Sequence, residues 1–149
     1  MSLKKKRRTI ILIILGMAFV ALGHALTAAV AAQEPVYKEL AGPGKKCWID
    51  LDHYFNYRFV EPPKMRTAIL KIQLFDKNGQ RVTDLNIVGM SDMPSMRGAH
   101  ESGEVAFKLN KKGDYLLPVN IVMAGEWEVK LHFLKGTDVI YRGSFKFHV

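Results

Sequence analysis

A short segment of the chain, residues 89–103, concentrates side chains that bind soft metal ions. Methionines recur in it at every third position, and a histidine follows four residues after the last of them: Met90, Met93, Met96 and His100. A thioether sulfur is soft, neutral and binds without losing a proton, which suits Cu(I), and imidazole also ligates copper. The segment is therefore a candidate copper site, with Met123 as a further ligand from later in the chain.

The same methionines have a second interpretation. Methionine is flexible, fills irregular gaps in hydrophobic cores and adapts to the surfaces of protein partners. Pro94, Gly98 and Gly103 interrupt regular structure, so the segment is predicted to be a loop between strands. Such a loop can close one end of a folded domain or contact another protein. The spacing alone leaves metal binding, packing and partner binding open.

The rest of the sequence offers little catalytic chemistry. It contains no Gly-x-Ser-x-Gly elbow, no His-Glu-x-x-His motif, no phosphate-binding loop and no Cys-x-x-Cys pair, so no enzymatic activity is predicted. Cys47 is the only cysteine and is interpreted as a buried small residue. Asp50 and His53 belong to a small polar cluster typical of a solvated strand. His132 takes an outward position and is expected to face water.

The N-terminal segment carries the three parts of an export signal. A basic cluster at residues 4–8 precedes an apolar run at 10–22, and an Ala-x-Ala site follows at 29–31. The stretch 10–32 has 23 residues without a formal charge, and a spanning helix needs about 20. Residues 1–32 are therefore a cleaved signal peptide or a single-pass membrane anchor. Either alternative predicts a periplasmic or other extracytoplasmic location, because the basic cluster stays in the cytoplasm.

Most of the positive charge belongs to this N-terminal segment. The whole chain has a formal net charge of +8, but residues 1–31 contain five basic and no acidic side chains. The remainder, with 17 basic and 14 acidic side chains, is only mildly basic. It shows no long stripe of Lys and Arg along the sequence, so a nucleic-acid partner is not expected.

Beyond a Pro- and Gly-containing linker predicted at residues 33–46, one domain is expected over residues 47–149. Apolar and polar residues alternate with the period of two that is typical of strands over several segments: 68–75, 105–109, 117–123, 127–133 and 141–147. The Asn78-Gly79 pair indicates a hairpin turn. This pattern predicts an all-β fold, an immunoglobulin-like antiparallel β-sandwich of about seven strands, preceded by an N-terminal apolar helix.

Two positions refine this prediction. Trp127 lies in the middle of an alternating strand and is expected to be the core tryptophan. Pro118 interrupts another strand on its outward face, which indicates an edge or a bulge, because proline cannot donate a ladder hydrogen bond.

The run GMSDMPSMRGAH followed by GDYLLPVNIVMAGEWEVKLHF resembles the YtkA-like family and the related FixH-like membrane-anchored proteins. The resemblance covers about residues 66–134 and is carried by Met93, Pro94, Met96, Gly113, Tyr115, Met123, Gly125 and Trp127. It implies a small extracytoplasmic β-sandwich, often anchored by one N-terminal helix, that is connected with copper handling or with assembly of respiratory oxidases. The architecture is also similar to that of CopC-like copper carriers. Their histidine at the mature N-terminus has no counterpart here, which argues against a Cu(II) site on the terminal amine.

Two functions from different classes are therefore expected as alternatives. One is a membrane-associated protein that binds or delivers copper through the methionine and histidine segment. The other is a non-catalytic accessory or assembly subunit of a larger membrane complex.

Overall fold

The structure is a computed structural model that describes residues 34–149. The expected signal peptide or anchor at residues 1–32 lies outside this part, and so does the expected N-terminal helix. Among the residues that the structure describes, no helix has the length and apolar character needed to cross a membrane.

Residues Pro35–Val149 form one compact unit. It contains ten strands and one short 3₁₀ helix within the described residues: β1 (Lys38–Glu39), β2 (Cys47–Trp48), β3 (His53–Phe59), β4 (Arg66–Asp76), β5 (Asn86–Asp92), η1 (Pro94–Met96), β6 (Val105–Ala106), β7 (Lys108–Leu109), β8 (Tyr115–Ile121), β9 (Glu126–Lys135) and β10 (Asp138–His148). The expected number of about seven strands is too low. Four of the ten described strands have only two residues, which is too short to give an alternating pattern in the sequence.

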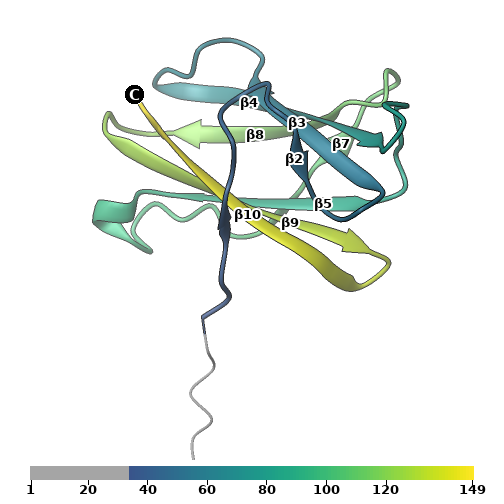
Figure 1. The fold of residues 1–149 in the computed structure, drawn as a ribbon. Coiled ribbons are helices and arrows are strands. Elements are labelled where there is room, and N and C mark those ends of the chain that lie inside the picture. Colours follow the sequence, from purple (N-terminus) through teal and green to yellow (C-terminus); the bar gives the residue numbers. More distant parts are fainter. Residues whose placement is uncertain (1–33) are drawn as a thin grey trace, which may run out of the picture. The chain divides into compact units, whose positions relative to one another are not determined.

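The strands form two five-stranded sheets that lie one above the other (Figure 1). One sheet has the order β1-β10-β9-β5-β6, and the other has the order β2-β3-β4-β8-β7. The all-β prediction with two sheets is confirmed. The prediction of purely antiparallel sheets is wrong in one place, because β1 pairs in parallel with β10.

The core lies between the two sheets and is rich in aromatic rings. Phe55 of β3 and Phe133 of β9 have ring centroids 4.5 Å apart, and Tyr57 and Phe145 are separated by 4.3 Å. Each pair joins one sheet to the other. Trp127 is completely buried, as its place in the alternating pattern predicts. Packing holds the sheets together, since Cys47 is a free thiol.

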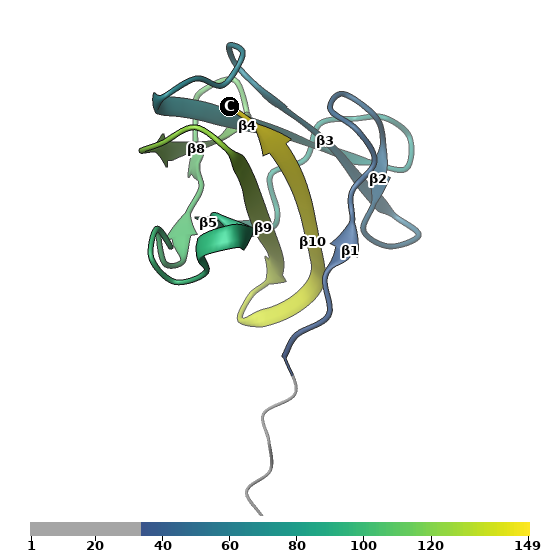
Figure 2. The same ribbon diagram turned by 90° about the vertical axis from the view of Figure 1, so that its left-hand side faces the viewer.

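The segment expected to be a linker is partly strand. The two residues of β1 pair with Gly143 and Ser144 of β10, and the two chain segments run side by side in Figure 2. The next residue, Leu40, is buried and packs over Gly143, where a side chain would leave it no room. The sandwich therefore begins before the predicted domain boundary at residue 47.

Pro118 lies where β8 has a neighbour on one side only. It is opposite Ile69 of β4, whereas β7 pairs with β8 only at Tyr115 and Leu116. The edge position expected for this proline is thus observed, and its missing N–H group costs no ladder hydrogen bond.

Candidate functional site

The methionine segment begins inside a strand. β5 extends to Asp92, and Met90 is paired with Lys130 of β9. The prediction that Met90 belongs to an irregular loop is therefore wrong. The strand continues because its inward positions, which include Ile87 and Ser91, are buried on the sheet. After β5 the chain forms η1 and a loop that leads to β6, as the prolines and glycines of the sequence predict.

Asp92 organises the start of this loop. One of its carboxylate oxygens accepts a hydrogen bond from the N–H of Met93 at 2.8 Å, and the other accepts one from the N–H of Gly98 at 3.0 Å. Farther along, the N–H of Ser102 donates to the carbonyl oxygen of Ser91 at 2.9 Å. The loop is therefore folded back on the end of β5 by its own polar groups.

The four methionines predicted as ligands do not share one position. Met93 is only 4% exposed and belongs to the hydrophobic core, whereas Met96 is 42% and Met123 38% exposed. Met90 has the opposite strand parity from the buried Ser91 and lies on the outer face of its sheet. Met90 is thus separated by the sheet from the core side on which Met93 lies. The complete predicted set of five ligands does not form a single site.

Trp127 is the neighbour that Met123 and His100 have in common. Its indole N–H donates a hydrogen bond to the carbonyl oxygen of Met123 at 3.0 Å. The imidazole ring of His100 lies 6.5 Å from the indole, measured between ring centroids. Met93 reaches the same turn, because its methyl group packs against Gly125. The loop after β5 and the turn between β8 and β9 therefore meet at one end of the sandwich, which we call the methionine end.

A further methionine, Met65, belongs to this end and is absent from the sequence prediction. It is 56% exposed and immediately precedes Arg66, which pairs with Ile121 at the end of β8. Figure 1 shows the β3–β4 loop, the end of β8 and η1 on the same side of the molecule. In the sequence, Met65 is distinguished only by its position directly before the long strand at 66–76. The strand register is needed to show that this position lies at the methionine end.

The donor groups at the methionine end are uncharged or weakly basic. Within residues 34–149, no group of three or more His, Cys, Asp or Glu side chains is arranged to hold a metal ion. Thioethers and one imidazole are thus the candidate ligands here. Such a set suits a soft monovalent ion, because thioether ligands carry no charge that would offset a higher one.

Cys47 does not take part in this site. It is buried in β2 with its sulfur facing the carbonyl oxygens of Ala41 and Lys45 at 4.0 and 3.9 Å. Burial raises the pKa of this thiol. Burial, together with the nearby Cys47, also raises the pKa of Tyr57 to about 12. The interpretation of Cys47 as a buried residue is confirmed.

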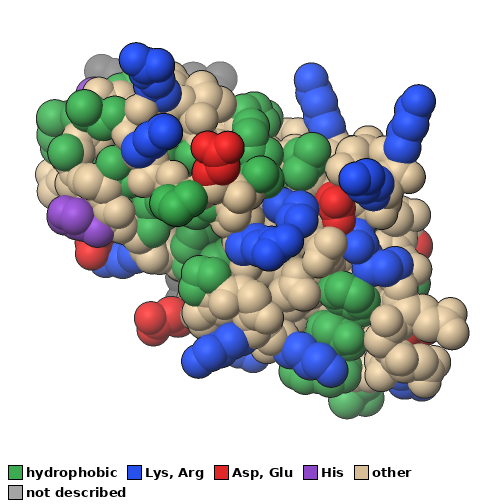
Figure 3. Space-filling view, turned by 90° about the horizontal axis from the view of Figure 1, so that it is seen from above, with side chains coloured by type: hydrophobic (Ala, Val, Ile, Leu, Met, Phe, Trp, Pro, Cys, Tyr) green, Lys and Arg blue, Asp and Glu red, His purple; other side chains and the backbone are tan. Residues whose placement is uncertain are grey.

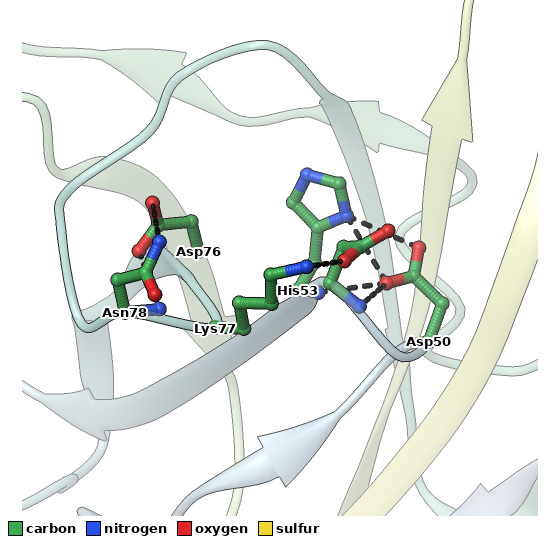
Figure 4. A network of polar contacts seen from close by, with 6 residues as sticks. Asp50, His53, Asp76, Lys77 and Asn78 are labelled. Atoms are coloured by element: carbon green, nitrogen blue, oxygen red, sulfur yellow. Dashed lines mark hydrogen bonds and ion pairs between the residues drawn. The ribbon is translucent and has the colours of Figure 1, made fainter.

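The polar cluster around Asp50 and His53 is a local network (Figure 4). One oxygen of Asp50 accepts hydrogen bonds from the backbone N–H groups of Asp52 and His53 at 2.7 Å each, and the His53 ring lies 3.1 Å from the same carboxylate. Lys77 donates to Asp52 at 2.9 Å. Burial acts to raise the pKa of Asp50, but these hydrogen bonds outweigh it and lower the pKa. The cluster holds the turn before β3.

His132 does not face water as predicted. Its Nε2 atom lies 2.7 Å from the hydroxyl oxygen of Tyr37, and its Nδ1 atom lies 3.1 Å from a carboxylate oxygen of Glu104. The Tyr37 ring stacks on the imidazole at 5.5 Å. His132 has the predicted outward parity, but the segment before β1 covers this position. Strand parity describes a side chain's direction and says nothing about a distant segment that packs over it.

Comparison with known proteins places the chain in a family. No curated protein matches it. Among solved structures, the crystal structure of "as isolated" FetP from uropathogenic E. coli strain F11, expressed in the periplasm of E. coli BL21(DE3), is similar with 14% sequence identity and a TM-score of 0.48, over 72% of this chain and 93% of that chain. The family model described as YtkA-like matches residues 55–132, which is more than half of the chain, so the protein belongs to the YtkA-like family.

Proposed function

We propose that this protein binds Cu(I) outside the cytoplasm through Met96, Met123 and His100. The observation that carries the proposal is that Met123 and His100 are both neighbours of Trp127, while Met96 follows Met93 in the loop that packs on the same turn. The sandwich supplies the rigid support, and we infer that it is of the immunoglobulin-like class. Export by residues 1–32, as an anchor or a signal, would bring the domain to the oxidising side of the membrane.

The exposure of the side chains assigns them different roles. Met96 and Met123 are accessible and can receive an ion from solvent or from a partner, whereas Met93 is buried in the hydrophobic core. Met96 and Met93 are also linked by a backbone hydrogen bond of 2.9 Å across η1.

The chemistry of this site would be binding and transfer. Thioether ligands stay neutral and need not lose a proton before they bind, so the ion can be taken up and released without acid–base chemistry at sulfur. A low-coordinate site with an exposed face is suited to passing the ion to a second protein.

A competitive Cu(I) titration of residues 33–149 under reducing conditions tests the proposal. The Met96→Leu/Met123→Leu variant is expected to bind Cu(I) at least about tenfold more weakly than the wild type. Met90→Leu is the matched control, because Met90 lies on the outer face of the sheet and should leave the affinity unchanged. Equal Cu(I) affinity of the double variant and the wild type would contradict the proposed copper site.

A second candidate function is a non-catalytic accessory subunit of a larger membrane complex. It is favoured by the apolar exposure of the same end, where Val122 is 52% exposed beside Met123, and Met65 is also open to solvent. The Met65→Asp/Val122→Asp variant should then lose co-purification with its complex from native membranes while it retains Cu(I) affinity. Migration of the wild type as an isolated monomer in native detergent extracts would contradict this function.

A further inference from the structure

A row of directly opposed side chains crosses the outer face of the sheet β2-β3-β4-β8-β7. Arg58 of β3 pairs with Lys71 of β4, Lys71 pairs with Leu116 of β8, and Leu116 pairs with Lys108 of β7. Directly opposed residues of antiparallel strands extend to the same face. Three cations from three strands therefore lie in one line, which we call the cation row. None of them is close to another in the sequence.

The cation row works against the stability of the sheet. Like charges placed directly opposite each other on neighbouring strands repel, and Arg58 and Lys71 form such a pair. Within residues 34–149, none of the ion pairs involves Arg58, Lys71 or Lys108. The nearby carboxylate of Asp114 is already engaged by Gln73 and Arg81, at 2.7 and 3.0 Å. Asp114 also attracts Lys71, which offsets part of the repulsion. The charges of Arg58 and Lys108 have no ion-pair partner among residues 34–149, and an external anion would offset them.

The surface around the row is hollowed and carries more cations. A shallow hollow of about 480 Å³ has a lining of three lysines, one carboxylate, one amide and two apolar side chains: Lys71, Lys111, Lys112, Asp114, Asn110, Val60 and Leu116. A second hollow of about 220 Å³ shares Val60 with the first and is lined by one acidic and one basic side chain, Glu61 and Lys64. Figure 3 looks onto this layer from above and shows Lys and Arg side chains gathered with hydrophobic groups between them and few acidic ones.

We propose that the cation row and these hollows bind the phosphate headgroups of an anionic membrane surface. Lysine ammonium groups bind phosphate as point charges, and each basic side chain near an anionic bilayer adds to its attraction. The exposed Val60 and the half-buried Leu116 supply the apolar contact that the boundary between headgroups and acyl chains accepts. A broad, shallow, open face fits a surface of many headgroups better than a single small anion.

A short segment precedes the sandwich. The uncharged N-terminal stretch ends at residue 32 and β1 begins at Lys38. The residues between them span about 17 Å when fully extended. If residues 1–32 stay in the bilayer, they tether the domain on the side of the other sheet, because Tyr37 packs on His132 of β9. If they are cleaved, the cation row provides the attachment itself.

Vesicle co-sedimentation of residues 34–149, which include the whole compact unit, tests the proposal. Vesicles of phosphatidylcholine mixed with phosphatidylglycerol are compared with vesicles of phosphatidylcholine alone. The wild type should bind the anionic vesicles, and added NaCl should release it. The Arg58→Gln/Lys71→Gln variant should bind them about 30-fold more weakly, the effect expected for two basic side chains near the surface.

A second variant and a matched control keep the result specific. Lys111→Gln/Lys112→Gln, in the exposed turn before β8, should also weaken binding, and circular dichroism verifies that each variant is folded. Lys38→Gln/Lys135→Gln removes the same charge from the other sheet and should bind as the wild type does. Equal binding to neutral vesicles, or an equal loss in this control, overturns the proposal. Binding to polyglutamate without binding to anionic vesicles also overturns it, in favour of an acidic protein partner.

Discussion

The methyl group of Met93 packs against the α-carbon of Gly125, so closely that a Cβ on Gly125 would lie 2.9 Å from the methyl carbon. The same glycine exchanges two backbone hydrogen bonds with Val149, of 2.7 and 3.0 Å. Gly125 therefore joins the methionine loop, the β8–β9 turn and the C-terminus. The relative position of Met96 and Met123 depends on this junction.

Gly125→Ala should destabilise the protein by about 1–3 kcal/mol, because the added methyl group meets Met93 and the backbone φ of 138° is unfavourable for alanine. Urea unfolding followed by tryptophan fluorescence measures the change. Gly136→Ala is the matched control, since Gly136 also has a positive φ but no atom within 4 Å of an added Cβ. The same loss in both variants would contradict the proposed contact with Met93.

Met93→Ala and Met96→Ala should separate the structural from the binding methionine. Truncation of the buried Met93 is expected to cost about 2–5 kcal/mol in the free energy of unfolding. Truncation of the exposed Met96 should change it by less than about 0.5 kcal/mol. Chemical unfolding of the metal-free proteins measures both values. If Met96→Ala costs as much as Met93→Ala, Met96 is a packing residue and not an accessible ligand.

Asp114 should make stability depend on acid pH. Burial acts to raise its pKa, but hydrogen bonds from Gln73, Arg81 and Asn110 outweigh this and hold the pKa below 3.8. Because the folded pKa is lowered, the stabilisation is complete well above pH 3.8 and is lost as the pH falls through the folded pKa.

The Asp114→Asn variant tests this effect. It should be less stable than the wild type by about 1–3 kcal/mol at neutral pH, since Arg81 then lacks its charged partner. The difference should narrow as the pH is lowered towards 3, which urea unfolding at several pH values would measure. A difference that stays constant with pH would contradict the assignment.

Cys47 should be unreactive in the folded protein. Its side chain is buried and its pKa is raised, so little thiolate is present and no reagent reaches it. Reaction with a thiol-specific chromogenic disulfide should be slow in buffer at mildly alkaline pH and complete in urea. Rapid reaction of the folded protein would show that β2 opens readily.

Arg58→Gln should raise the free energy of unfolding by about 0.2–1 kcal/mol, because it removes the like-charge pair with Lys71. The gain should shrink in high salt, which screens the repulsion. Thermal unfolding at low and high NaCl measures it. A loss of stability at low salt would mean that Arg58 has a favourable partner, and the argument for an external anion at the cation row would fail.

The alternation of apolar and polar residues predicted the buried faces correctly. Trp127 and the residues that follow it at every second position are completely buried, and Pro118 lies at an open stretch of strand. This information is local, because a strand turns alternate side chains to opposite faces whatever it pairs with. The same rule separates Met90 from Met93, but the predicted loop begins four residues too early, at residue 89, whereas β5 ends at Asp92.

Relations between distant segments are decided only by the tertiary structure. The sequence could not place Met65 beside the β8–β9 turn, cover His132 with Tyr37, or bring Arg58, Lys71 and Lys108 into one row. Each of these depends on strand order and register, which are selected by how well the two inner faces pack together and not by any single strand. The sequence by itself determined the fold class, the inward faces and the methionine-rich loop. The packing of the sheets decided which of those methionines are buried and which are exposed.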